Sequence, residues 1–303
     1  GLEAYNQLAI ANLVQGIVGV GAFAVGAKTA GVDGALFALI LYSSVGLIAY
    51  QLVIRRALAA MDIRLNFAAI SSTLPIFWRF SVPAALMGIA IAPFKWLAEA
   101  GLARSSGFAE LGMFHVSMLV ANVLFTLVST INSPLISLTA NDIGAAGNER
   151  LKYLSMYGGW FLFVIVSLPL IAFPQLPSLV FGEVSQGEKL AQLCLLMTLY
   201  SGLMLYYQGV LRLITQWGSM WLTLITNVFE GVTLFGVYLV LADWGVVGLC
   251  VAYLASYVVR IAVTVPIIMR ADFVPRHIIL DKYFLGTLVL VSATAAIQLA
   301  RVA

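Results

Sequence analysis

Long apolar runs, separated by short polar connections, extend over almost the whole chain. Most runs are about 20 residues long, the length that an α-helix needs to cross a hydrocarbon layer about 30 Å thick. They exceed the roughly 9–11 residues of a membrane-barrel strand and lack the alternation of a strand. The pattern predicts nine transmembrane helices, at residues 6–26, 34–54, 80–98, 111–136, 154–173, 190–211, 219–241, 246–268 and 283–300.

The composition agrees with this interpretation. Of the 303 residues, 62% are hydrophobic and 10% are charged, whereas soluble globular proteins carry about 25% charged residues. Such a chain has too little polar surface to cover a water-soluble body of its size. We therefore expect an all-α, polytopic membrane protein.

The distribution of lysine and arginine predicts the orientation. If residue 1 is cytoplasmic, the connections on that side carry ten of these residues and the opposite connections carry three. This excess satisfies the positive-inside rule. The ten are Arg55, Arg56, Arg64, Arg79, Arg150, Lys152, Arg212, Arg270, Arg276 and Lys282, and the three are Lys28, Arg104 and Lys189.

The first two predicted spans resemble the seventh and eighth. Asn-Leu-Val-Gln-Gly at 12–16 matches Asn-Val-Phe-Glu-Gly at 227–231, and Gly-Val-Asp-Gly at 31–34 matches Gly-Val-Val-Gly at 245–248 after a slip of one residue. Both pairs start on the same side of the membrane, which indicates a parallel repeat. Matches between small apolar residues also arise by chance, so the repeat is a hypothesis.

The repeat predicts two lobes of six helices, of which the second is complete. The chain would then have four parts: the last two helices of the N-terminal lobe at 1–54, a cytoplasmic interfacial linker at 55–78, the C-terminal six-helix lobe at 79–270 and an additional C-terminal helix at 271–303. Helical spacing of apolar residues in the linker favours a helix lying on the membrane surface. An ordinary cytoplasmic loop is the alternative.

Charged residues inside the spans are candidates for function, because each costs roughly 2.5–3.5 kcal/mol on insertion scales. Lys95 and Glu99 lie one helical turn apart, so they either neutralise each other or act in a site. Arg260 lies midway along its span, and Glu230 is its expected partner by depth. The two residues either form a structural pair or line an anion-binding cavity.

Other polar residues in the spans have simpler interpretations. Arg79 and Arg212 are expected near the cytoplasmic ends of their helices, where snorkelling to the interface is the ordinary explanation. His115 is expected to pack between helices, with a proton relay as the alternative. Several aromatic residues, Tyr157 and Trp160 among them, are expected in the interfacial belts.

Catalytic and cofactor motifs are absent from the sequence. It contains no Walker A loop, no G-x-G-x-x-G, no H-E-x-x-H and no C-x-x-C. With two histidines and two cysteines, a metal centre or a disulfide framework is not expected. The net charge of +3 comes from scattered residues, so no nucleic-acid-binding surface is expected. We predict no enzyme activity and no cofactor, which leaves secondary transport or lipid flipping.

Short motifs at the starts of the third and fourth spans, and after the fifth, resemble those of one known family. They are Arg-Phe-Ser-Val-Pro at 79–83, Gly-Phe-Ala-Glu-Leu-Gly-Met-Phe at 107–114 with Ser-Pro-Leu at 133–135, and Leu-Val-Phe-Gly at 179–182. They are similar to motifs of the polysaccharide flippases, including O-antigen flippases, of the multidrug/oligosaccharidyl-lipid/polysaccharide exporter superfamily. The resemblance covers nearly the whole chain, placed from about the fifth helix of the family onward.

The resemblance implies a two-lobe exporter with a central cavity that opens alternately to either side of the bacterial inner membrane. Family members move polyprenyl-diphosphate-linked oligosaccharides from the cytoplasmic to the outer leaflet. Besides this substrate and membrane lipids, a polysaccharide polymerase or another assembly protein is an expected partner. The resemblance also implies that the first four helices are missing from this chain and that residues 283–300 begin a terminal pair of helices.

A diphosphate headgroup needs cations, and arginine forks and lysine ammonium groups are its natural partners. We infer from depth that the cavity cations are Arg79, Lys95, Arg212 and Arg260, and that Glu99 and Glu230 are possible coupling or ion-pair acids. A multidrug cation antiporter of the same fold, which would use Glu230, Glu99 or Glu110, is one alternative. A non-transporting scaffold of a glycan-assembly complex is another.

Overall fold

The computed structural model of the chain describes residues 5–62, 74–141, 149–173, 187–270 and 281–302. These residues are almost entirely helical, and no strand occurs among them. The chain divides into two compact units, residues 1–73 and 74–303. Each unit is described by itself. The division lies within the predicted linker, whose residues 63–73 are outside the described part.

Six helical segments in the described part are long and apolar enough to cross a membrane. This gives the chain the character of a multi-pass helical membrane protein. The segments are Asn6–Ala60, Leu74–Ser106, Phe108–Leu127, Lys189–Thr215, Met220–Val240 and Ala242–Arg270, and two shorter apolar helices are Met156–Ile165 and Phe284–Ala293.

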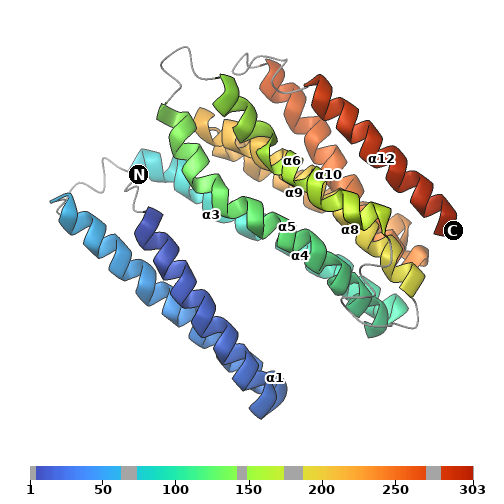
Figure 1. Cartoon of the computed structure of the whole chain (residues 1–303), viewed down its shortest axis with the longest axis horizontal. Coiled ribbons are helices and arrows are strands. Elements are labelled where there is room, and N and C mark those ends of the chain that lie inside the picture. The colour runs from blue at the N-terminus through green and yellow to red at the C-terminus, as the bar shows by residue number, and fades with distance from the viewer. Residues whose placement is uncertain (1–4, 63–73, 142–148, 174–186, 271–280, 303) are drawn as a thin grey trace. The chain divides into compact units, whose positions relative to one another are not determined.

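Unit 1 consists of α1 (Tyr5–Ala60), which reverses direction at Gly31 and forms a hairpin of two arms (Figure 1). Gly31 has φ 58° and ψ −130°, a conformation that is essentially restricted to glycine. The arms contain the predicted spans 6–26 and 34–54. Near their open end, the Tyr50 hydroxyl donates to Asn12 Oδ1 at 2.6 Å and lies 3.2 Å from Gln15 Oε1.

Unit 2 begins with a broken helical segment in place of the predicted span 80–98. It comprises η2 (Phe77–Ser81), a π-helical turn, followed by α3 (Val82–Ala90) and α4 (Ala92–Ser106). Pro83 and Pro93 lie at the first turns of α3 and α4, where a missing N–H is tolerated. The break between α3 and α4 leaves backbone carbonyls available to other partners.

The later predicted spans coincide with helices of unit 2. Figure 1 shows these helices packed side by side, and α8 contacts α5, α6 and α10. Most of the α8 apolar segment is buried, which makes α8 the central helix of the unit. The helices are α5 (Phe108–Asn141), α6 (Glu149–Ala172), α8 (Gly187–Trp217), α9 (Met220–Val240), η3 (Ala242–Trp244), α10 (Gly245–Arg270) and α12 (Lys282–Val302).

The aromatic residues of α6 correct one expectation. Tyr157 and Trp160 are 2% and 1% exposed, so they are core residues and do not form an interfacial belt. The reason is that α12 covers this face of α6. The Trp160 indole donates to Thr287 Oγ1 at 2.8 Å, and Phe284 contacts the rings of both aromatic residues.

The turn between η3 and α10 has the same geometry as the turn of α1. Gly245 has φ 59° and ψ −133°, within a few degrees of the angles of Gly31. Three residues later, a Cβ on Gly34 would lie 2.0 Å from the carbonyl oxygen of Gly26, and one on Gly248 would lie 2.2 Å from that of Leu241. Both turns therefore need glycine at the same two places.

Candidate functional site

The charged residues of the spans gather where α4, α9 and α10 pack together. Asn227 and Glu230 lie three residues apart on α9, so their side chains share one face of that helix. Arg260 comes from α10, and Lys95 comes from α4, which packs against both helices. The sequence-predicted Lys95, Glu230 and Arg260 are thus brought into one region.

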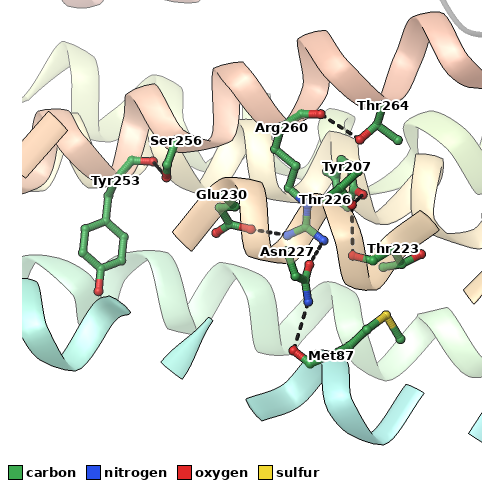
Figure 2. Close-up of polar contacts among 10 residues, drawn as sticks. All are labelled: Met87, Tyr207, Thr223, Thr226, Asn227, Glu230, Tyr253, Ser256, Arg260 and Thr264. Atoms are coloured by element: carbon green, nitrogen blue, oxygen red, sulfur yellow. Dashed lines mark hydrogen bonds and ion pairs between the residues drawn. The ribbon is translucent and has the colours of Figure 1, made fainter. Parts of the chain in front are cut away.

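Arg260 is the centre of a buried polar network (Figure 2). Its side chain is 8% exposed, and the guanidinium donates to the Glu230 carboxylate and to Asn227 Oδ1. The guanidinium carbon also lies 4.0 Å from the centre of the Tyr207 ring, which is a cation–π contact. The expected pairing of Arg260 with Glu230 is confirmed, and both charges are shielded from solvent.

Asn227 links this network to the broken helix segment. Its Nδ2 donates to the backbone carbonyl of Met87 at 3.0 Å (Figure 2). In a continuous helix the Met87 carbonyl would accept a hydrogen bond from the Ile91 N–H. Because α3 ends before Ile91, that N–H donates to the Ile89 carbonyl instead. The pattern of charged residues does not predict a site role for Asn227, and the sequence repeat aligns this residue with Asn12.

Lys95 and Glu99 do not form the ion pair that their spacing allows. The Lys95 ammonium lies 5.4 Å from the centre of the Tyr253 ring. The Glu99 carboxylate accepts a hydrogen bond from the Tyr253 hydroxyl at 2.9 Å and lies 3.9 Å from His115 Nε2. Within the described residues, Lys95 has no carboxylate at ion-pair distance.

Three other residues considered in the sequence, Arg79, Arg212 and His115, differ in how far they are exposed to solvent. Arg79 lies exposed on η2, beside the exposed Phe77 and Trp78. Arg212 is 3% exposed within α8, so the expectation that it snorkels to the interface is wrong. The His115 side chain is 57% exposed, so the expectation of a buried packing histidine is wrong as well.

A second charged cluster joins α5, α8 and α10. Glu110 on α5 forms an ion pair with Lys189 at the start of α8. Its other carboxylate oxygen accepts the backbone N–H of Val246 at 2.8 Å, in the first turn of α10. A carboxylate at this position satisfies a free N–H and complements the helix dipole. The sequence does not predict the contacts of Glu110 with Lys189 and Val246, because the three residues lie on different helices.

An apolar cavity lies elsewhere, between α6, α8, α10 and α12. It has a volume of about 410 Å³, and its walls include Trp160, Leu199, Leu254 and Leu288. Ser292 is the polar residue of its lining. None of the predicted charged residues lines it. The cavity therefore has no groups that would bind a charged headgroup.

Metal chemistry finds no support in the described part of the chain. No group of three histidine, cysteine, aspartate or glutamate side chains is placed to hold a metal ion there. Cys194 and Cys250 are both buried and free. Comparison of the chain with protein-family models, with curated proteins and with solved structures finds no match.

Proposed function

We propose that the protein is a membrane flippase that moves a polyprenyl-diphosphate-linked oligosaccharide, such as an O-antigen or another polysaccharide repeat unit, between leaflets. One observation carries this proposal: ionisable groups from α4, α9 and α10 are gathered inside a bundle of membrane-spanning character. Burying charge is costly, even for a paired arginine and glutamate. Replacing such a pair by apolar residues is often neutral or stabilising. The presence of the buried Arg260–Glu230 pair therefore favours a role in function in addition to any role in stability.

The available donors suit a phosphate-bearing headgroup. A lysine ammonium has three N–H donors. Lys95 contacts a ring, and among the described residues no carboxylate lies at ion-pair distance from it. Lys95 is therefore the residue we assign to direct contact with a diphosphate oxygen. Arg260 is engaged by Glu230 and Asn227, so its part is to hold α9 and α10 together beside that contact.

The two-lobe architecture is part of the proposal. In it, 1–54 and 79–270 belong to the N-terminal and C-terminal lobes of an alternating-access exporter of the bacterial inner membrane. The headgroup crosses in water while the lipid tail stays in the bilayer. Support comes from the matching turns at Gly31 and Gly245, whose backbone angles agree and whose sequences align in the repeat.

A cation antiporter is the second candidate, and Glu99 is the residue that favours it. Its carboxylate is 27% exposed and has no lysine or arginine at ion-pair distance within the described residues. A carboxylate without a lysine or arginine beside it is available to a cationic substrate. Glu110 and Glu230, the other two acids considered for this role, are already paired with Lys189 and Arg260.

Reconstitution separates the two candidates. The purified chain is placed in liposomes whose inner or outer leaflet carries a fluorescent polyprenyl-diphosphate sugar, and exposure of the label to an added quencher is followed. The flippase proposal predicts faster exchange between leaflets than in protein-free liposomes. A parallel assay measures uptake of a cationic dye. Dye uptake without lipid exchange would replace the flippase proposal by the antiporter.

A further inference from the structure

Three of the glutamates in the helices of unit 2, Glu99, Glu110 and Glu230, differ in their partners. Glu110 and Glu230 each form an ion pair with a lysine or arginine. Glu99 instead faces His115 Nε2 at 3.9 Å and accepts a hydrogen bond from Tyr253 at 2.9 Å. A carboxylate that a fixed cation already neutralises has little capacity to bind a proton. Glu99 has no lysine or arginine at ion-pair distance within the described residues. Its neighbour is a histidine, the residue type whose unperturbed charge changes near neutral pH.

We propose that Glu99 on α4 and His115 on α5 form a proton-binding site, and that its protonation strengthens the binding of an anionic headgroup beside Lys95. The bound proton is shared between the imidazole Nε2 and the carboxylate, which draws the two side chains together from their present 3.9 Å. Because the residues lie on different helices, proton binding tightens α4 against α5. The second half of the proposal rests on the proposed function, and the first half does not.

The charges around Glu99 and His115 explain why proton binding should strengthen anion binding beside Lys95. Two cations, Lys95 and Arg260, are balanced by two anions, Glu99 and Glu230, while the imidazole is neutral. A proton taken up from water leaves this region with one excess positive charge. The Tyr253 hydroxyl of α10 donates to the Glu99 carboxylate, and the Tyr200 ring of α8 packs edge-on against the Tyr253 ring.

Proton and anion binding must then promote each other equally, since coupling between two binding sites is reciprocal. The pair is open to exchange: the side chains of Glu99 and His115 are 27% and 57% exposed. Glu230 is 1% exposed, so the Arg260 network does not offer the same access. Position and exposure together assign proton binding to Glu99 and His115.

The first test measures the histidine itself, without transport. The sequence has two histidines, so a His277→Gln chain labelled with ¹⁵N-histidine in lipid nanodiscs reports on His115 alone. We expect Glu99→Gln to make His115 take up its proton only in more acidic buffer, because the facing carboxylate is lost. Asp243→Asn, which removes an exposed acid in η3, is the matched control and leaves the titration unchanged. Equal titrations in Glu99→Gln and the parent chain would overturn the proton site.

The second test measures linkage, using a short-chain polyprenyl diphosphate as the probe. We expect the wild-type chain to bind the probe at least about fivefold more tightly in weakly acidic than in alkaline buffer, within the usual range of coupling between sites. In Glu99→Gln the affinity becomes independent of pH. Binding with the same pH dependence in both proteins would overturn the linkage. No binding at any pH, together with the expected His115 titration, would refute the proposed substrate and the linkage while leaving the proton site in place.

Discussion

Arg260 illustrates how a charged side chain is kept inside an apolar bundle. Its guanidinium is matched by the Glu230 carboxylate, the Asn227 amide oxygen and the face of the Tyr207 ring. The Nε atom is buried and has no hydrogen-bond partner among the residues that the structure describes. The group is thus largely but incompletely satisfied, so the network depends strongly on the carboxylate.

Glu230→Gln is expected to destabilise the protein by about 3–5 kcal/mol, because it leaves the buried Arg260 charge uncompensated. The double variant Glu230→Leu with Arg260→Met removes both charges and is expected to recover most of this loss. Unfolding in mixed detergent micelles measures both. If the double variant were as unstable as Glu230→Gln, uncompensated charge would not be the source of the instability.

Sequence reasoning found part of this site and missed part of it for one physical reason. Depth along a helix is readable from apolar runs, so Arg260 and Glu230 could be paired before the structure was known. Which face of a helix another helix covers is not readable in the same way. The burial of Arg212 by the packing of α8, and the bond from Asn227 to the Met87 carbonyl at a helix break, both depend on such packing.

At the scale of elements, two glycine turns and several helix breaks determine how the helices meet. Hydrophobic runs predicted where helices lie, and the structure places helices at those positions. The runs did not predict the π-helical turn η2 or the break between α3 and α4. Those features follow from local backbone geometry and from prolines at helix starts, which leave the average hydropathy unchanged.

Gly245→Ala is expected to destabilise the protein more than Gly31→Ala. Both substitutions carry a strained backbone, which costs about 1–3 kcal/mol, but the new Cβ at 245 would also lie 2.4 Å from Glu110 Oε2. No atom of the described part of the chain lies within 4 Å of a Cβ at 31. Gly236→Ala, at an open position inside α9, is the control and should be neutral or stabilising. Thermal unfolding of the three variants in detergent ranks them, and an equal effect at 31 and 245 would contradict the contact with Glu110.

At the scale of the whole molecule, the chain is a series of apolar helices whose connections carry most of its positive charge on one predicted side. The hairpin turns at Gly31 and Gly245 share one geometry, which agrees with the sequence repeat between these segments. Orientation is a prediction of charge distribution alone. It is open to a direct test because both native cysteines are buried.

Single cysteines introduced at exposed positions should label from opposite sides of the membrane. Asp62→Cys follows the second predicted span and Asp243→Cys lies in η3, each in a chain with Cys194 and Cys250 replaced by alanine. The positive-inside rule predicts that an impermeant maleimide reaches position 243 in intact cells and position 62 only after the membrane is opened. Labelling with the reverse sidedness would invert the proposed orientation.

The central claim is that a partly buried lysine in the bundle binds the phosphate-bearing headgroup, and transport by Lys95→Gln tests it most directly. Loss of one charge-assisted contact is worth about 1.5–3 kcal/mol, so leaflet exchange of the fluorescent polyprenyl-diphosphate sugar should slow roughly ten- to hundredfold. Arg104→Gln, near the end of α4, is the control and should retain the wild-type rate. Wild-type exchange by a folded Lys95→Gln protein would contradict the account.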